Sequence, residues 1–546
     1  MRFILTISVI LNFTVVVTLS SAQPRYHQDD MVTYADSRNV WCVDIGREDV
    51  FVTTDGGIWR FSRFTGDALD PWFAGIGLHE AIPLTNGRVI LWHEDSGTLW
   101  LATTHELLYW RSDFRTWYRL DDHRVQNQRI KSLGDAGEFI LVEISGTEDR
   151  VLAIDPHSLR METMAGDLPA NVRWTGKRGW TPHEFPSYFT TDFSIFFNSE
   201  DGSIKDWQQD VFMPIFEQFN DYDRKSYICY PGLGLAIADR RRMNLDLFQP
   251  GPAGNDVKAI ALDDDGVIWT GGNNSTAKSG FNRFDRQTGR WFRYDESLTF
   301  GLDSHRAWDA LIYNNQVYFA TDQGLVRYNK DDDDWKTYDR FDGLAGLDLR
   351  ALACVKSVLF VGSNQGLNRF KLPSGPIWKA GFEAADELIT SDFTTEHGNI
   401  WAAGLQGVIR FSRDVVSEIE TKGEIFSAEP SRSIEITGGR IWIGTTYGIK
   451  VFDKSSETWT DILGKVHLDG GKPLDMVGND SLLWIGTDKG LKRFNFLRGN
   501  WVEYSVREGL PHLRVQKIVL ESDTLWIGTP RGLTRFLWNR PERDVF

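Results

Sequence analysis

The chain has 546 residues, of which 41% are hydrophobic and 25% are charged, so it can bury the core of a large repeat protein and is not disordered. Its formal net charge of −16 repels phosphate backbones and anionic lipid. These values argue against nucleic acid as a partner and favour a neutral, cationic or metal-bridged ligand.

Residues 1–22 have the pattern of a secretory signal peptide. Arg2 is followed by an apolar run to about Leu19 and by small residues that end at Ala22. A membrane anchor is less well supported, because a spanning helix needs about 20 apolar residues. We therefore predict cleavage after Ala22 and a periplasmic or extracellular protein. No later segment is apolar for long enough to cross a membrane, so no span is expected after signal removal.

A motif recurs along the rest of the chain, and each copy is centred on an aromatic or apolar anchor residue. Successive anchors are 40 to 49 residues apart. A repeat of this length is typical of β-propellers. It argues against a parallel β-helix, because the repeats of that fold are shorter. The anchors are Phe51, Trp100, Ile140, Tyr188, Ile228, Trp269, Tyr318, Phe360, Trp401, Trp442, Trp484 and Trp526.

Each repeat predicts a small antiparallel sheet of four strands. The apolar run around the anchor predicts a buried strand, and a further apolar strand precedes it. A glycine six positions after most anchors predicts a tight hairpin to a third strand, because glycine accepts positive φ. An outer strand follows, opened by tryptophan, as in Trp501 to Tyr504. Four strands in about 42 residues are the pattern of a propeller blade.

The two ends of the chain predict how the repeats close. The last repeat ends at Phe536 without an outer strand, whereas Met31 to Tyr34 is an outer strand without a repeat of its own. We predict that the N-terminal segment completes a closing blade, since a ring leaves no free sheet edge. Leu245 to Phe248 could close a second ring in the same way.

The predicted fold class is therefore all-β, a tandem β-propeller of about twelve four-stranded blades in two rings. Five divergent repeats occupy residues 23–248, the N-terminal β-propeller, and seven regular repeats occupy residues 249–546, the C-terminal β-propeller. Two rings of six blades, or one ring joined from both chain ends, remain alternatives.

The motif Leu/Ile-Trp-Ile-Gly-Thr-x-x-Gly-Leu/Ile-x-x-Phe, with its trailing Trp-x-x-Tyr, resembles the two-component regulator propeller repeat. In that family the repeats form the periplasmic sensor of hybrid histidine kinases, commonly two propellers that recognise oligosaccharides. The resemblance covers nearly the whole mature chain and is specific from about residue 256 onward. The sequence has no immunoglobulin-like, membrane, kinase or regulator domain after the repeats, so the resemblance implies the fold and not the signalling.

Candidate sites are few, and no catalytic motif, metal pattern or cofactor motif is found. The acidic runs Asp263 to Asp265 and Asp331 to Asp334 could suit calcium, but their position between strands favours solvated turns. The three cysteines, Cys42, Cys229 and Cys354, are interpreted as small buried hydrophobes.

The longest departure from the repeat, residues 171–186, is the predicted ligand-binding segment. Basic and aromatic side chains in an acidic protein suit a sugar or an anionic ligand. An inter-blade linker whose tryptophans cover a ring edge explains the same composition. The candidate residues are Trp174, Lys177, Arg178, Trp180 and His183.

Three functions remain open on this evidence. The favoured hypothesis is an exported, non-catalytic binding protein that recognises an oligosaccharide or an envelope protein through its blade loops. The first alternative is a propeller enzyme, a lyase or a glycoside-processing enzyme, for which no converging acid and base groups are visible. The second alternative is the sensory partner of a separate histidine kinase.

Overall fold

The computed structural model describes residues 29–539 except 79, 147–149, 165–167, 170, 177–187, 191–194, 199–202, 207–209, 213–214, 218–224, 240–243, 274–279, 382, 412–422 and 464–467. Almost every element is a β-strand; the exceptions in these residues are α1 (Glu383–Asp386) and a short 3-10 helix (Val506–Glu508). The all-β prediction is therefore confirmed. Across the described residues, no helix has the length and apolar character of a membrane span.

Within the described part of residues 40–248, five antiparallel sheets and one hairpin follow one another along the chain. These are called the N-terminal sheets. Their strands are β2 (Val40–Ile45), β3 (Asp49–Thr54), β4 (Gly57–Ser62) and β5 (Ala68–Trp72); the hairpin β6 (Ala74–Ile76) and β7 (Ala81–Pro83); β8 (Gly87–His93), β9 (Thr98–Thr103), β10 (Leu107–Arg111) and β11 (Thr116–Arg119); β12 (Arg129–Asp135), β13 (Ile140–Ser145), β14 (Arg150–Ile154), β15 (Met161–Thr163) and β16 (Arg173–Thr175); β17 (Tyr188–Thr190), β18 (Ile195–Asn198), β19 (Ile204–Asp206) and β20 (Val211–Phe212); and β21 (Ile215–Glu217), β22 (Lys225–Tyr230), β23 (Gly234–Asp239) and β24 (Asn244–Phe248).

The described residues from 257 onward form seven further four-stranded sheets, called the C-terminal sheets. Their strands are β25 (Val257–Leu262), β26 (Val267–Gly272), β27 (Phe281–Asp285) and β28 (Arg290–Tyr294); β29 (Ala307–Tyr313), β30 (Gln316–Thr321), β31 (Leu325–Asn329) and β32 (Asp334–Tyr338); β33 (Leu349–Val355), β34 (Val358–Ser363), β35 (Gly366–Lys371) and β36 (Ile377–Lys379); β37 (Thr390–Glu396), β38 (Asn399–Gly404), β39 (Gly407–Phe411) and β40 (Gly423–Ser427); β41 (Ser431–Thr437), β42 (Arg440–Thr445), β43 (Gly448–Asp453) and β44 (Thr458–Leu463); β45 (Pro473–Gly478), β46 (Leu482–Thr487), β47 (Gly490–Asn495) and β48 (Asn500–Tyr504); and β49 (Lys517–Glu521), β50 (Thr524–Thr529) and β51 (Gly532–Leu537) with β1 (Met31–Tyr34).

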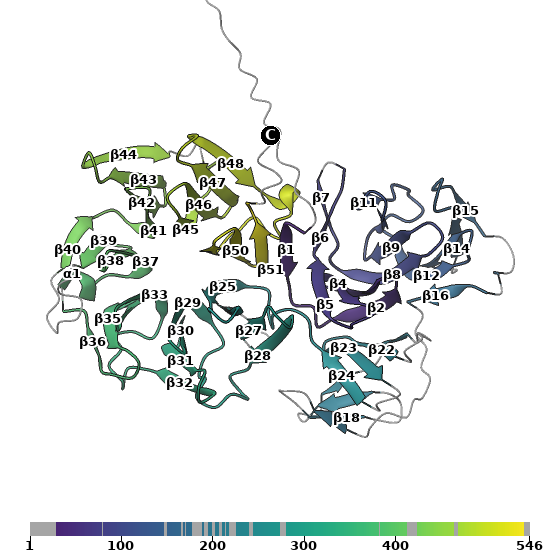
Figure 1. Cartoon of the computed structure of the whole chain (residues 1–546), viewed down its shortest axis with the longest axis horizontal. Coiled ribbons are helices and arrows are strands. Elements are labelled where there is room, and N and C mark those ends of the chain that lie inside the picture. The colour runs from purple at the N-terminus through teal and green to yellow at the C-terminus, as the bar shows by residue number, and fades with distance from the viewer. Residues whose placement is uncertain are drawn as a thin grey trace, which may run out of the picture.

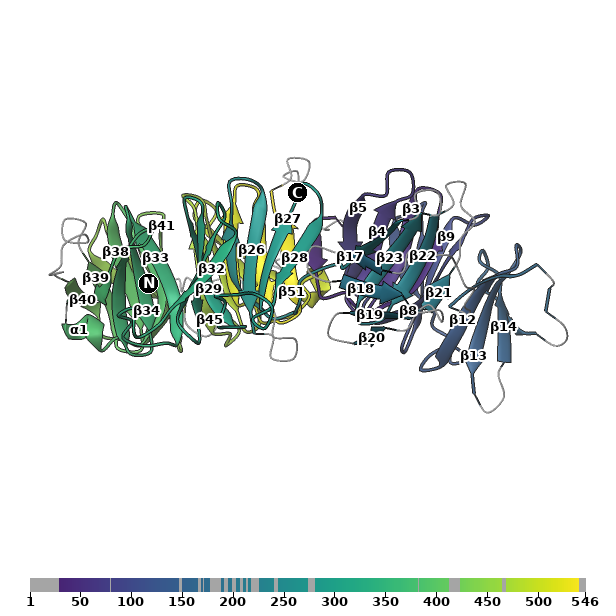
Figure 2. The same ribbon diagram turned by 90° about the horizontal axis from the view of Figure 1, so that it is seen from below.

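The sheets are arranged like the blades of a propeller (Figure 1). Each C-terminal sheet packs its first strand against the first strand of the next, from β25 to β49, and β49 contacts β25 again. Among the N-terminal sheets, β2 packs on β8, β8 packs on β12, and β2 also contacts β22. Seen from the side, the two groups of sheets lie next to each other along the long axis (Figure 2).

The repeat anatomy explains the sequence motif. All anchors but one lie on the second strand of their sheet; Trp484, for example, is fully buried on β46. The assignment of Tyr188 as an anchor was wrong, because it lies on β17, the first strand of its sheet, and β18 is the second. Gly490 has a φ of +119°, and a Cβ there would lie 2.6 Å from the carbonyl oxygen of Tyr504 on the outer strand. The hairpin therefore needs glycine for both its dihedral angle and its close approach.

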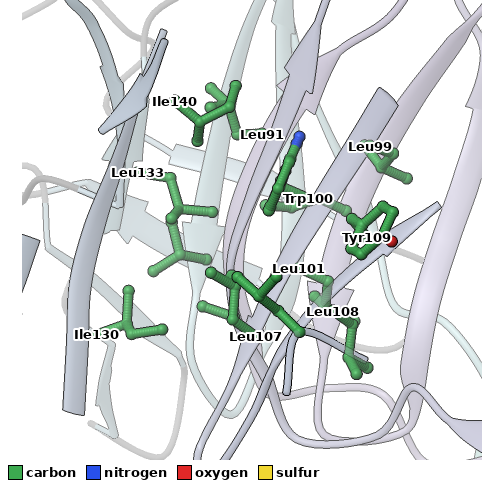
Figure 3. Packing of buried hydrophobic residues seen from close by; sticks show 14 of the residues in the cluster. Leu91, Leu99, Trp100, Leu101, Leu107, Leu108, Tyr109, Ile130, Leu133 and Ile140 are labelled. Atoms are coloured by element: carbon green, nitrogen blue, oxygen red, sulfur yellow. The ribbon is translucent and has the colours of Figure 1, made fainter. Parts of the chain in front are cut away.

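Apolar side chains between neighbouring sheets form the core. Figure 3 shows this packing between the β8–β11 sheet and the β12–β16 sheet, where Leu101, Leu107, Ile130 and Leu133 converge. The cysteine interpretation is confirmed for Cys42 and Cys229, which are buried, whereas Cys354 is only half-buried.

The N-terminal segment occupies the place of the missing outer strand. Strand β1 pairs antiparallel with β51, with Tyr34 opposite Leu533 (Figure 1). In the preceding sheet, Tyr504 of the outer strand lies opposite Leu491 in the same way. The predicted closing strand is therefore confirmed. Strand β24, by contrast, pairs with its sequence neighbour β23 and needs no exchange between chain ends.

Because β1 belongs to the last sheet, the chain crosses twice between the two groups of sheets. The crossings lie side by side, since the backbone N–H of Ser37 donates to the carbonyl of Pro250 at 3.3 Å. Arg293 holds the second crossing, with Nη2 donating to the carbonyls of Pro250 and Gly251 at 3.0 and 2.8 Å. Two bonded crossings restrain the relative movement of the groups more than a single linker would.

Charged side chains on the first strands of the C-terminal sheets form a charge layer, defined by Asp309, Asp392, Asp475 and Lys517. Each aspartate directly follows a β-bulge, so the three have the same register in their sheets. Each also accepts a backbone N–H from the next first strand, at 2.7 to 2.9 Å. The carboxylates therefore join neighbouring sheets.

Lys517 is the counter-ion within this layer. Its Nζ lies 2.9 Å from Oδ1 of Asp309, and its charge also acts on Asp392 and Asp475. Burial raises the pKa of Asp475 to about 6 against the opposing effect of Lys517. Burial and the charge of Asp475 raise the pKa of Asp392. Three carboxylates thus share one ammonium group.

The burial of Glu435, on β41, leads us to expect that the stability of the protein depends measurably on pH. Burial is the main cause that raises its pKa to about 8, above the value of about 4.5 expected for the unfolded chain. The native state therefore holds the proton more tightly, and the free energy of unfolding should fall as the pH rises from about 5 to 8. We expect Glu435→Gln to remove about 2–4 kcal/mol of this fall. Urea unfolding of both proteins at pH 5 and pH 8 measures it; parallel pH profiles would contradict the assignment.

A candidate binding pocket between the two groups of sheets

A cavity of about 610 Å³ lies where the first N-terminal sheet meets the first and last C-terminal sheets. Its lining comes from β1, β4, β5, the turn between β27 and β28, β50 and β51. The volume is in the range of small-ligand sites, which often lie at junctions between structural units. The lining residues come from three parts of the chain, within residues 34–70, 284–292 and 526–535, which lie more than 200 residues apart in the sequence.

Aromatic side chains line this pocket from both groups of sheets. Trp59 comes from the N-terminal sheets, and Tyr34, Phe284 and Trp526 come from the C-terminal sheets. The rings of Tyr34 and Phe284 lie 4.8 Å apart and those of Tyr34 and Trp59 lie 6.4 Å apart. All four belong to one continuous apolar cluster, so the two groups share a core at this point.

One wall of the pocket is an ion pair that joins the two groups. Nη2 of Arg535 lies 2.6 Å from Oδ2 of Asp70, and the hydroxyl of Tyr34 donates to Oδ1 of Asp70 at 3.1 Å. Burial and the neighbouring Asp70 carboxylate raise the pKa of Tyr34, so the phenol stays a neutral donor. This contact fixes the closing strand β1 to β5.

The opposite wall is built around Arg286. Its Nη1 lies 2.7 Å from Oε2 of Glu521, and its Nε donates to the carbonyl of Gly266 at 2.7 Å. Trp526 Nε1 also donates to Glu521. The guanidinium is held on two sides and gives the pocket a fixed polar surface.

Several polar side chains at the pocket are exposed and free to meet a ligand. Asp67 and Arg290 line it, and neither has an ion-pair partner among the described residues. Gln287 and Thr288 are exposed in the turn between β27 and β28. The four aromatic rings are almost completely buried, so these exposed polar side chains are the groups that a neutral polar ligand such as a sugar would contact.

Two of the three aspartates that line the pocket are engaged in hydrogen bonds. Both oxygens of Asp70 are engaged, by Arg535 and Tyr34. Burial would raise the pKa of Asp285, but hydrogen bonds from Thr288 and Gln287 lower it instead. A glycoside-processing enzyme needs two available carboxyl groups. Among the described residues, Asp67 is the pocket aspartate whose side chain has no such partner.

Of the predicted ligand-binding residues, only Trp174 is among the residues that the structure describes, and it lies away from the pocket. Trp174 is on β16, opposite Gly134 of β12, and a Cβ on Gly134 would lie 3.0 Å from its ring. Trp174 therefore packs on a neighbouring strand, and it does not line the pocket. Lys177, Arg178, Trp180 and His183 lie outside the described residues, so their ligand-binding role stays a prediction.

Arg173 anchors the start of this segment, a role that the sequence did not indicate. Its Nη1 lies 2.5 Å from Oδ1 of the buried Asp44, and Nη2 donates to the carbonyl of Trp92 at 2.6 Å. Strand β16 thereby joins β2, β8 and β12. The described part of the departure from the repeat has a structural role.

The acidic runs lie in turns for the most part, as predicted, but Asp334 begins β32 and Asp263 is buried. Asp263 pairs with Lys330 at 2.7 Å, and Asp334 pairs with Arg327 at 2.9 Å. Among the described residues, no group of three or more histidine, cysteine or acidic side chains is arranged to hold a metal ion.

Comparisons with known proteins give similarities of structure. No protein-family model matches the sequence, and no curated protein matches it. The extracellular domain of BT4673 from B. thetaiotaomicron is 12% identical, with 95% of this chain and 83% of that chain covered and a TM-score of 0.44. The extracellular domain of BT3049 from the same organism is 14% identical, with 91% and 68% covered and a TM-score of 0.42.

A similar degree of likeness is found to PorZ, a surface component of the type-IX secretion system of Porphyromonas gingivalis. It is 14% identical, with 91% of this chain and 74% of that chain covered and a TM-score of 0.45. The chain is thus similar in structure to extracellular domains assigned to two-component systems and to a bacterial surface protein.

Proposed function

We propose that the chain is an exported, non-catalytic binding protein built from two β-propellers, of five and seven blades. The return of first-strand packing from β49 to β25, and from β21 to β2, supports this division. The seven-bladed unit takes its last outer strand from the N-terminus, so the five-bladed unit is an insertion between β1 and β25.

The observation that carries the binding function is the pocket between the two units. Its volume of about 610 Å³ and its exposed polar side chains, among them the unpaired Asp67 and Arg290, suit an oligosaccharide. Sugars hydrogen-bond to charged and amide side chains. The signal sequence and the resemblance to the periplasmic sensor repeat support the same proposal, with the periplasm or the exterior as its location.

A glycan array followed by thermal-shift titration of the mature protein tests the proposal. We expect a glycan that raises the melting temperature, and at least tenfold weaker binding for Asp67→Ala/Arg290→Ala, because both side chains lie at the pocket. Arg498→Ala is the matched control, since Arg498 is an exposed arginine in the turn between β47 and β48, outside the pocket.

Two outcomes would overturn this assignment. Binding that survives in the double variant would place the ligand elsewhere, and binding lost equally in Arg498→Ala would show a non-specific charge effect. Chromatography of the bound glycan after incubation separates binding from catalysis, because a shortened or unsaturated product would support the enzyme alternative.

A further inference from the structure

Two phenylalanines on neighbouring loops of the C-terminal sheets are completely exposed. Phe300 lies between β28 and β29, and Phe341 lies between β32 and β33; each has a relative exposure of 100%. Single exposed apolar residues are common on protein surfaces. Two aromatic rings without any contact, on adjacent loops, are a different case, because both remain fully hydrated in the isolated protein.

Hydrogen bonds fix the loop that carries Phe300. Oδ1 of Asp295 accepts the backbone N–H of Ser297 at 2.8 Å, and Leu302, two residues after Phe300, is buried. The hydroxyl of Thr337 donates to the carbonyl of Gly301 at 2.9 Å. The loop is thus attached to β32 at the residue next to Phe300.

The loop that carries Phe341 is fixed in the same manner. Oδ1 of Asp339 accepts the N–H of Phe341 at 2.7 Å, and Oδ2 of Asp342 accepts the N–H of Asp339 at 3.0 Å. Leu344 is buried below the loop. Phe341 lies only four residues after Thr337, the residue that bonds the Phe300 loop, so the two phenylalanines belong to the same part of the surface.

The surface around the two rings is acidic. Residues 295–306 and 339–348, called the Phe300–Phe341 surface, contain two arginines, Arg306 and Arg340, against six carboxylates. The carboxylates are those of Asp295, Glu296, Asp303, Asp339, Asp342 and Asp348. Arg306 is already paired with Asp322 of a neighbouring turn. Three of the carboxylates are also paired, Glu296 with His305, Asp342 with Lys336 and Asp348 with Arg350. Asp295, Asp303 and Asp339 have no ion-pair partner among the described residues, and they outnumber the one remaining cation, Arg340. The excess of negative charge therefore favours a partner that carries lysine and arginine around an apolar recess.

We propose that the Phe300–Phe341 surface docks a basic protein, with the two rings inserted into apolar recesses of that partner. A projecting ring buries most of its area only when the partner surrounds it, which a flat sugar chain does not do. Because the loops are already ordered, little conformational entropy is lost on binding. This surface is distinct from the pocket: the pocket uses the turn between β27 and β28, whereas the Phe300 loop follows β28.

Photo-crosslinking tests the proposal, with p-benzoylphenylalanine introduced at position 341 in cells of the source organism. Position 497 is the matched control, because Leu497 is 87% exposed in the turn between β47 and β48, at the opposite end of its sheet. We expect a discrete adduct with a basic protein from position 341 and none from position 497.

The affinity of the purified partner then decides the outcome. We expect Phe300→Ser/Phe341→Ser to weaken its binding more than tenfold without changing the melting temperature, and 500 mM salt to weaken it as well. Adducts that are identical at both positions, an adduct with a second copy of the chain or with a polysaccharide, or an affinity unchanged in the double variant would each overturn the proposal.

Discussion

Deletion of residues 23–36 is expected to lower the melting temperature by about 5–10 °C and to cause aggregation, because it removes β1 from the last sheet. Val32 and Tyr34 are buried, and the hydroxyls of Thr33 and Thr534 lie 2.8 Å apart across the pair of strands. Burial of the two larger side chains contributes about 3–6 kcal/mol, and the ordering of four residues offsets part of it. Without β1, the edge of β51 is exposed to other chains.

Rescue in trans separates loss of the strand from general damage. A synthetic peptide of residues 29–38, added during refolding of the truncated protein, should restore the melting temperature, while a scrambled peptide should not. Differential scanning calorimetry and light scattering report the two effects. A truncated protein that remains monomeric with unchanged stability would show that the last sheet does not depend on β1.

Substitution Lys517→Met is expected to destabilise the protein by about 3–5 kcal/mol at pH 8, because it leaves buried carboxylates without their counter-ion. The side chains of Lys517 and Asp309 are only 20% and 9% exposed. Without the ammonium group the folded-state pKa values of Asp392 and Asp475 rise further above their unfolded values. Stability is then retained at acidic pH and lost as the pH rises through the raised values.

Urea unfolding at pH 5 and pH 8 measures this effect. The loss should be much smaller at pH 5, where the carboxyl groups take up protons, and Lys517→Met/Asp309→Asn should recover part of the stability at pH 8. Lys258→Met is the matched control, since Lys258 is also on a first strand and equally exposed, but pairs with the partly exposed Asp256. Equal losses in the two lysine variants, or a loss independent of pH, would refute the charge layer.

The pocket illustrates what the sequence could not predict. Tyr34 was correctly placed on an outer strand by its Trp-x-x-Tyr-like position, but nothing in the sequence indicated that this strand would face Asp70 and Arg286. Those residues look like ordinary members of their own repeats. They come together only where the N-terminal sheets contact the C-terminal sheets. Such a contact depends on the shape of the two folded surfaces, which cannot be deduced from the residue pattern within a single repeat.

In the segment of residues 171–186, the described part, residues 171–176, has a structural use that its composition did not indicate. Its aromatic and basic composition suggested a ligand site, yet Trp174 packs on Gly134 and Arg173 pairs with the buried Asp44. A charged or aromatic side chain can fill a structural gap as well as a binding site. Composition alone cannot distinguish these uses, because they differ only in what lies opposite the side chain.

The sequence by itself determined the strand pattern, because strand formation, hairpin turns and anchor burial depend on residues close together in the chain. It also determined the exchanged strand, since an unpaired outer strand at one end and a missing one at the other end can be counted without coordinates. The tertiary structure alone decided the pocket, the charge layer and the two exposed phenylalanines. Each of these depends on which repeats become neighbours across the assembled sheets, and near-identical repeats carry too little local information to specify that in advance.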